Sequence, residues 1–137
     1  MVPRTLIDTA QIPGGEELRL FQRGRDFMIV LDRNALMNTR MSGSEEALAT
    51  MTIARLGKRP GARLLIGGYG MGFTLRAALA DLPKDAQVTV AELVPEILDW
   101  ARGPMHELTA GCLDDRRVST EIEDVGAVID GAANAYD

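Results

Sequence analysis

The stretch of sequence that decides the fold is residues 64–76, LLIGGYGMGFTLR. A short apolar run is followed by four glycines within six residues, Gly67, Gly68, Gly70 and Gly72, after which a helical pattern begins. Glycine at a strand-to-helix turn permits positive φ, lets a ligand approach the backbone, and leaves the amides at the helix start free. The stretch therefore predicts a ligand site at the first turn of an α/β unit.

The residues on either side of this turn alternate between strand and helix patterns. We expect short strands at 63–67, 87–92 and 117–122, helices at 75–82, from Pro95 to Ala101, and at 125–135, and a short helical piece at 105–108. Strand, helix and strand at this spacing predict a parallel sheet with right-handed crossovers. The fold class is thus α/β.

The first 42 residues follow another pattern. Residues 17–32, ELRLFQRGRDFMIVLD, contain two extended runs around a turn at 23–26, which predicts a small antiparallel β meander. Ser42 and Glu45 have the spacing of a capping box, so we expect a helix to begin there, with apolar positions at helical spacing such as Leu48 and Met51.

Composition limits the possible partners. A net charge of −5 over 137 residues argues against nucleic acid as the main partner, because such partners select basic surfaces. One cysteine and one histidine, Cys112 and His106, cannot make a disulfide or a zinc site of soft ligands, so we expect no metal. No run approaches the roughly 20 apolar residues that span a bilayer. We therefore expect a cytoplasmic protein without a membrane partner.

The glycine pattern at the turn excludes two common nucleotide sites. Gly68, Gly70 and Gly72 form G-x-G-x-G, whereas the third glycine of the dinucleotide fingerprint would fall at Phe73. The stretch also lacks the Gly-Lys-Ser/Thr of a phosphate-binding loop. Hydride-transfer cofactors and nucleoside triphosphates are thereby disfavoured.

Acidic residues at the ends of the next two strands point to a nucleoside. Glu92 lies 20 residues after Gly72, where a carboxylate can accept hydrogen bonds from both ribose hydroxyls. Asp124 follows the third strand, where a carboxylate can accept from an adenine amino group, although Glu121 and Glu123 compete for that role. Within the turn, Tyr69 and Met71 either contact the ligand or pack in the core.

Together, residues 62–79 and 88–102 resemble the class I S-adenosylmethionine-dependent fold, and most closely the spermidine synthase (polyamine aminopropyltransferase) family. The family's turn reads I-G-G-G-D-G-G-T-L-R, and its second strand ends in an acid. The resemblance implies a Rossmann-like parallel sheet of the class I methyltransferase type, partial in this chain. We expect a meander at 1–42, a gate-like linking helix and turn at 43–61, and a Rossmann-like nucleoside-binding domain at 62–137.

The resemblance implies S-adenosylmethionine or decarboxylated S-adenosylmethionine as cofactor, and methylthioadenosine as a product-like ligand. Gly68, Gly70 and Gly72 would approach its tail, Glu92 its ribose and Asp124 its base, and Tyr69 is a further candidate for contact with it. The family's Tyr-His-Glu in the linking helix is here Leu48, Ala49 and Thr50, and its turn Asp is Gly70. Aminopropyl transfer and methyl transfer in a full-length parent therefore both stay open, and no catalytic residue is assigned. The alternative is a catalytically inactive scaffold or oligomerisation domain that retains the cofactor fold.

The resemblance also places the strand at 63–67 in the centre of the family's sheet, between the second and fourth strands. The sequence ends at Tyr136 and Asp137, where the family's fourth strand opens. An unpaired central strand is a liability that proteins cover. We therefore expect the chain to be a piece of a longer protein or a homo-oligomer in which another copy covers that strand.

Overall fold

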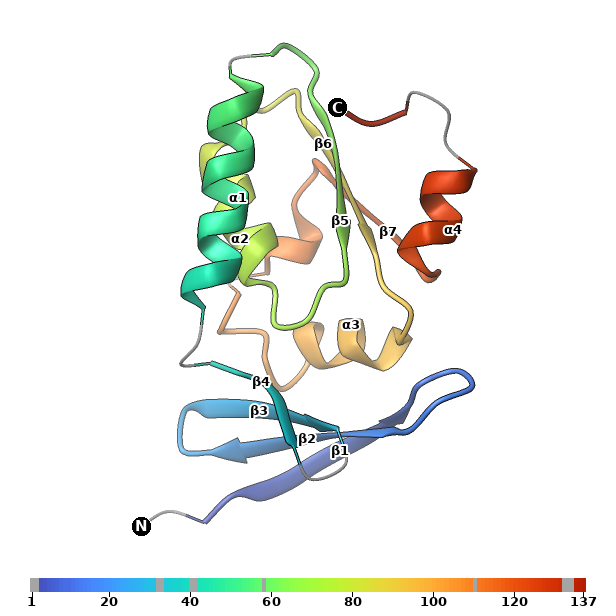
Figure 1. Ribbon diagram of the computed structural model, residues 1–137. Coiled ribbons are helices and arrows are strands. Elements are labelled where there is room, and N and C mark those ends of the chain that lie inside the picture. Colours follow the sequence, from blue (N-terminus) through green and yellow to red (C-terminus); the bar gives the residue numbers. More distant parts are fainter. Residues whose placement is uncertain (1–2, 32–33, 40–41, 58, 110, 132–134) are drawn as a thin grey trace. The chain divides into compact units, whose positions relative to one another are not determined.

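A computed structural model describes residues 3–31, 34–39, 42–57, 59–109, 111–131 and 135–137 (Figure 1). The chain divides into two compact units, Met1–Ser42 and Gly43–Asp137. The division falls where the sequence pattern changes from strands alone to alternating helices and strands. Each unit is described by itself.

The first unit is an antiparallel meander of four strands in the order β1-β2-β3-β4. Its strands are β1 (Thr5–Gln11), β2 (Glu17–Arg23), β3 (Asp26–Leu31) and β4 (Asn34–Asn38). Leu20 of β2 is paired with Ile29 of β3, and both are fully buried, because residues directly opposite point to the same face of a sheet. The predicted meander is confirmed.

The turn between β2 and β3 is set by Gly24. Arg23 pairs with Asp26, so the hairpin has a two-residue loop, and Gly24 adopts φ 59°. Such tight loops need positive φ, which glycine adopts without steric cost. The RGRD stretch therefore folds as the turn that the sequence indicates.

The second unit contains a parallel sheet of three strands in the order β5-β6-β7. The strands are β5 (Arg63–Gly67), β6 (Gln87–Ala91) and β7 (Val118–Glu121), and their register aligns Gly67 with Ala91 and Ala91 with Glu121. Because parallel strands end at one edge of the sheet, the segments that follow β5, β6 and β7 come together there. This confirms the predicted α/β class.

Helices cover both faces of this sheet. They are α1 (Gly43–Leu56), α2 (Phe73–Asp81), α3 (Pro95–Arg102) and α4 (Val125–Asp130), and Figure 1 shows α1 and α2 on one side of the strands with α4 on the other. Val88, Val90 and Leu75 are almost fully buried between these layers. No helix among the described residues is long and apolar enough to cross a membrane.

One expectation about the helices needs correction, and the helix predicted at 125–135 forms over Val125–Asp130, with residues 132–134 outside the described part of the chain. Residues 105–108 form turns rather than a helical piece, and the short 3-10 helix η1 lies further on, at Cys112–Asp114. The helix at 43–56 forms as predicted, but its exposed side carries Leu48 and Met51, which are 61% and 67% exposed. Its buried residue is Ala49, because the small side chain lets α1 pack closely against α2.

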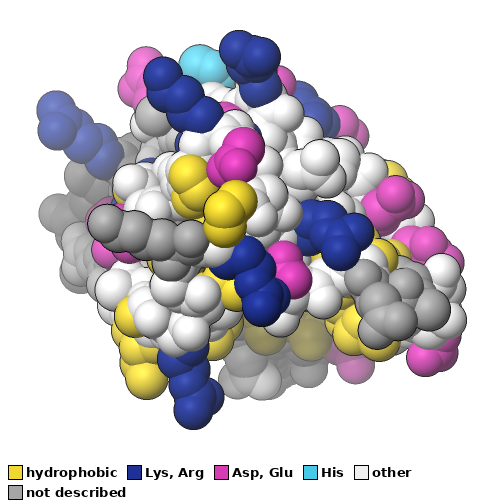
Figure 2. All heavy atoms as spheres, turned by 90° about the horizontal axis from the view of Figure 1, so that it is seen from above, with side chains coloured by type: hydrophobic (Ala, Val, Ile, Leu, Met, Phe, Trp, Pro, Cys, Tyr) yellow, Lys and Arg dark blue, Asp and Glu magenta, His cyan; other side chains and the backbone are white. Residues whose placement is uncertain are grey.

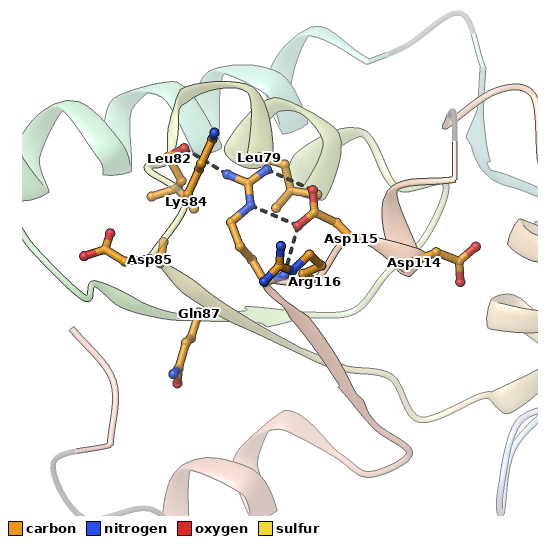
Figure 3. A pocket seen from close by; sticks show the side chains of 10 residues that line it. Leu79, Leu82, Lys84, Asp85, Gln87, Asp114, Asp115 and Arg116 are labelled. Atoms are coloured by element: carbon orange, nitrogen blue, oxygen red, sulfur yellow. Dashed lines mark hydrogen bonds and ion pairs between the residues drawn. The ribbon is translucent and has the colours of Figure 1, made fainter.

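A polar cleft of about 900 Å³ lies where β6 and β7 begin (Figure 3). Arg117 organises it. Its guanidinium donates two hydrogen bonds to the Asp115 carboxylate, at 3.0 and 2.9 Å, and a third to the carbonyl of Leu82 at 2.8 Å. These contacts tie the segment before β7 to the end of α2.

Charged side chains elsewhere on the surface do not form a field of one sign on the face drawn in Figure 2. There, Lys and Arg side chains are interspersed with Asp and Glu. Interspersed charges of both signs favour solubility over binding to a polyanion.

The Asp115 contact gives a pH-dependent prediction. Hydrogen bonds from Arg117 lower the pKa of Asp115 to about 2, below the unfolded value of about 3.9. A carboxyl whose folded pKa is depressed stabilises the fold above its unfolded pKa and loses that effect as pH falls toward the folded value. Asp115→Asn should cost about 1 kcal/mol in denaturant unfolding at pH 7, with the gap to wild type narrowing from about pH 4 to about pH 2.

Asp114→Asn is the matched control, since the Asp114 carboxylate is 69% exposed and lies 3.9 Å from Arg102. It should have a smaller effect at pH 7. A loss in Asp115→Asn that does not depend on pH would contradict this account of the ion pair.

Candidate functional site

The turn that follows β5 depends on its glycines. Gly68, Gly70 and Gly72 adopt φ values of 85°, 58° and 83°, which L side chains rarely tolerate. Gly67 has a different reason to lack a side chain, since a Cβ there would lie 3.0 Å from Val125 of α4. The turn is therefore shaped by backbone conformation and by close packing at the carboxyl edge of the sheet.

The Glu92 carboxylate holds this turn in place. Glu92 follows β6 directly, is 6% exposed, and accepts a hydrogen bond from the Tyr69 amide at 2.9 Å through Oε1. Its Oε2 accepts from the Val94 amide at 3.1 Å. An ionised carboxylate offers about four lone-pair sites, so each oxygen keeps capacity for another donor. The structure thus places the glycine turn and the acid of the next strand in direct contact.

The Tyr69 side chain fills the space next to Gly72 in the turn. Its ring is buried, its hydroxyl donates to Thr109 Oγ1 at 3.3 Å, and it lies 3.7 Å from Cys112 Sγ. Burial raises the pKa of both Tyr69 and Cys112. A Cβ on Gly72 would approach the Tyr69 hydroxyl to 2.3 Å, so the missing side chain of Gly72 makes room for this ring.

The turn is open next to Gly68. A Cβ built on Gly68 meets nothing within 4 Å, whereas Met71 is only 3% exposed. The side chains of Tyr69 and Met71 therefore belong to the packing of the turn. Of the predicted turn residues, Gly68 faces free space.

Asp124 lies at the same edge of the sheet, and its side chain is exposed. The Glu92 amide donates to the Glu121 carbonyl at 2.8 Å, and the Glu123 amide donates to the Glu92 carbonyl at 3.1 Å. These bonds hold the segment before α4 beside Glu92. Glu121, the last residue of β7, and Glu123 are exposed as well, so all three acids named as candidates are accessible at this edge.

Some residues that build this site carry no signal in the sequence. Thr109 and Cys112 lie 40 and 43 positions after Tyr69, and their packing against its hydroxyl appears only in the fold. Val125 could have been found, because it begins the helix directly after Asp124, at the same edge of the sheet where β5 ends at Gly67.

The chain is similar in sequence to known proteins. No protein-family model matches it. Curated polyamine aminopropyltransferases of Mycobacterium tuberculosis and Mycobacterium bovis are 31% identical to it over 119 residues, which is 86% of this chain and 22% of theirs. The chain thus spans about a fifth of the length of the curated relatives it matches.

Solved structures share the fold. Spermidine synthase from Thermotoga maritima and a spermidine synthase in complex with the transition-state analogue AdoDATO each superpose with a TM-score of 0.74 at 20% identity, covering 96% of this chain and 45% of theirs. A probable spermidine synthase from Corynebacterium glutamicum gives 0.56 at 16% identity, over 90% and 46%. The chain is thus similar to spermidine synthases over most of its own length.

A cavity of about 200 Å³ adjoins the turn. It lies between α1, α2 and β5, and its lining is aliphatic or small apart from Thr52 and Thr74. Both hydroxyls donate to backbone carbonyls, Thr52 to Leu48 at 2.7 Å and Thr74 to Glu45 at 3.2 Å. Leu48 and Ala49, which stand where the family has Tyr and His, are part of the lining.

Because the turn is packed next to Gly72 and open next to Gly68, we expect Gly72→Ala and Gly68→Ala to lower the free energy of unfolding by different amounts. Gly72→Ala combines positive φ with a clash against the Tyr69 ring and Thr109, and should cost about 2–4 kcal/mol. Gly68→Ala has the same backbone strain but free space, and should cost about 1–2 kcal/mol. Denaturant unfolding of both variants measures this difference, and equal losses would contradict the packing of Tyr69 against Gly72.

Proposed function

We propose that the chain is the part of a spermidine synthase-like transferase that binds an adenosyl sulfonium cofactor. The cofactor is S-adenosylmethionine or decarboxylated S-adenosylmethionine, and methylthioadenosine is a product-like ligand. The observation that carries the proposal is the contact of the Glu92 carboxylate with the Tyr69 amide, directly beside the open face of Gly68. A cytoplasmic location, expected from the sequence, belongs to the same proposal.

The ligand would lie across the carboxyl ends of β5, β6 and β7. The ribose hydroxyls would donate to the free lone pairs of Glu92, whose two backbone donors already aim its oxygens. The amino-acid or aminopropyl tail would pass over the backbone of Gly68 and Gly70, and the adenine amino group would donate to Asp124. A buried carboxylate that is held from two sides is preorganised for such bonds.

In a full-length parent, the reaction would be transfer of an alkyl group from sulfur to a nucleophile. The acceptor's lone pair forms a bond to the carbon next to the sulfonium, and the carbon–sulfur bond breaks with its electrons going to sulfur. The product is a neutral thioether, a good leaving group, so catalysis depends mainly on the alignment of donor and acceptor. The residues of this site bind and orient the donor in that scheme.

The cavity beside the turn favours an uncharged acceptor. An ammonium group that loses water needs acceptor atoms, and among the described side chains of the lining only the Thr52 and Thr74 hydroxyl oxygens can accept. Its lining contains no carboxylate among the described residues. This supports methyl transfer over aminopropyl transfer to a polyamine.

A specific observation favours the second candidate, a scaffold without activity. Both Glu92 oxygens bond to backbone amides of the protein itself, so the residue has a structural role that needs no ligand. In that case, the domain would retain the cofactor fold without activity and would serve in oligomer assembly. Binding measurements separate the two candidates, because only the first stabilises the fold in proportion to ligand concentration over Kd.

Glu92→Gln tests the ribose contact. The substitution removes the charge and turns one acceptor into a donor, and hydrogen bonds to a charged group are worth about 1.5–3 kcal/mol. Methylthioadenosine should therefore bind at least about 10-fold more weakly in calorimetric titration at a temperature where both proteins are folded.

Glu123→Gln is the matched control, since it removes the same charge from an exposed residue on the neighbouring segment. It should bind methylthioadenosine like wild type. Equal affinity in Glu92→Gln and wild type would rule out the ribose contact, and no binding by wild type at millimolar ligand would support the scaffold.

Asp124→Asn tests recognition of the base. If Asp124 accepts from the adenine amino group, wild type should prefer methylthioadenosine to methylthioinosine, which has a carbonyl at that position. The variant should lose most of this preference, while Glu121→Gln should keep it. Competition binding of the two nucleosides measures the ratio, and an unchanged ratio in Asp124→Asn would assign the base to another residue.

A further inference from the structure

Two buried polar side chains of the described residues, those of Glu92 and Thr109, contact the same residue of the glycine turn. Glu92 accepts from the Tyr69 amide at 2.9 Å, and Thr109 accepts from the Tyr69 hydroxyl at 3.3 Å. Buried polar groups are costly unless they are hydrogen-bonded, so each of the two needs its bond to Tyr69. Tyr69 thus connects the carboxylate at the end of β6 to a hydroxyl in the core.

Every polar group of Tyr69 is hydrogen-bonded within the protein. Besides the amide and the hydroxyl, its carbonyl accepts from the Gly72 amide at 2.9 Å, which closes a tight turn over residues 69–72. The turn brings Gly72 against the Tyr69 hydroxyl, where there is no room for a Cβ. The ring, the turn and the amide therefore move together, and the position of the ring sets the direction of the amide that holds Glu92.

The Thr109 end of the contact is fixed by other parts of the second unit. The Leu108 carbonyl accepts from Arg76 of α2 at 3.0 Å, and the Thr109 carbonyl accepts from the Cys112 amide at 3.0 Å. The single hydrogen of the Tyr69 hydroxyl is directed to Thr109, so the Cys112 thiol is the donor in its 3.7 Å contact with that hydroxyl. The hydroxyl is thus held from two sides by a segment that is itself tied to α2.

We propose that Tyr69 is a positioning residue for Glu92, whose carboxylate is held by the Tyr69 amide in the orientation that binds the ribose. The bond between the Tyr69 hydroxyl and Thr109 fixes that amide. The inference rests on the proposed function, and the Tyr69 side chain acts through Glu92 rather than by contact with the ligand. A ligand that meets a carboxylate already held in place loses less freedom on binding. The buried side of the turn thereby controls affinity for the nucleoside.

A second pair of hydroxyl groups provides a matched control. Thr89 of β6 and Ser119 of β7 also lie 3.3 Å apart, within the sheet rather than at its carboxyl edge. Loss of either pair can lower the stability of the fold, but only the Tyr69 pair includes the residue that holds Glu92. Stability alone therefore does not test the proposal, whereas preference for the ribose hydroxyls does.

Calorimetric titration of the folded full chain with methylthioadenosine and with its 2′,3′-dideoxy form measures this preference. Wild type should bind methylthioadenosine about 10-fold more tightly or better, because the dideoxy form lacks both ribose hydroxyls. Tyr69→Phe and Thr109→Val should each reduce this ratio by at least about 3-fold. Thr109→Ser, which keeps the hydroxyl, and Thr89→Val should keep the ratio. A purely structural role would weaken both nucleosides alike and leave the ratio unchanged, which would overturn the proposal.

Amide hydrogen exchange of the free protein tests the positioning without a ligand. The amide of residue 69 should exchange at least about 10-fold faster in Tyr69→Phe and in Thr109→Val than in wild type, relative to the Val90 amide in the middle of the sheet. In Thr89→Val the two amides should keep their wild-type ratio. Exchange at residue 69 that follows Val90 in every variant overturns the proposal. Binding of neither nucleoside by wild type overturns the proposed function alone, because the exchange result decides separately whether the Tyr69 hydroxyl positions Glu92.

Discussion

The structure of the second unit depends on one buried carboxylate and the two backbone amides that it accepts. Glu92 Oε1 bonds to the Tyr69 amide, and Oε2 bonds to the Val94 amide. One bond ties the turn after β5 to the end of β6, and the other shapes the entry to α3. A buried carboxylate is costly without such donors, so the side chain and the two turns require each other.

The glycine turn works differently on its two sides. On the Gly72 side, the missing Cβ makes room for the Tyr69 ring, which anchors the turn to Thr109 and Cys112. On the Gly68 side, positive φ leaves the backbone open to solvent. The anchored side holds the open side in position. A preorganised backbone beside an aimed carboxylate reduces the entropy that a ligand loses on binding.

Local patterns in the sequence carry much of this arrangement. The apolar run of residues 64–66, the glycines after it and Glu92 at the end of the next strand predict the parallel sheet and the contact between turn and acid. What could not be predicted depends on distant partners. The burial of Tyr69 needs Thr109, and the exposure of Leu48 and Met51 follows from the close approach of Ala49 to α2, neither of which has a periodic signal. Residues 105–108 have helical residue types, but they form turns. Gly103 and Pro104 come directly before them, and the chain must then cross to the start of β7.

The central claim is that a nucleoside binds between the Gly68 backbone and the Glu92 carboxylate. Two-dimensional amide NMR of the full chain, titrated with methylthioadenosine, tests it most directly. The account predicts that the amide signals of Gly68, Tyr69 and Val94 shift together and saturate at one ligand concentration, because all three lie on the Glu92 carboxylate or beside it. Saturable shifts elsewhere in the chain with these three unchanged would contradict it.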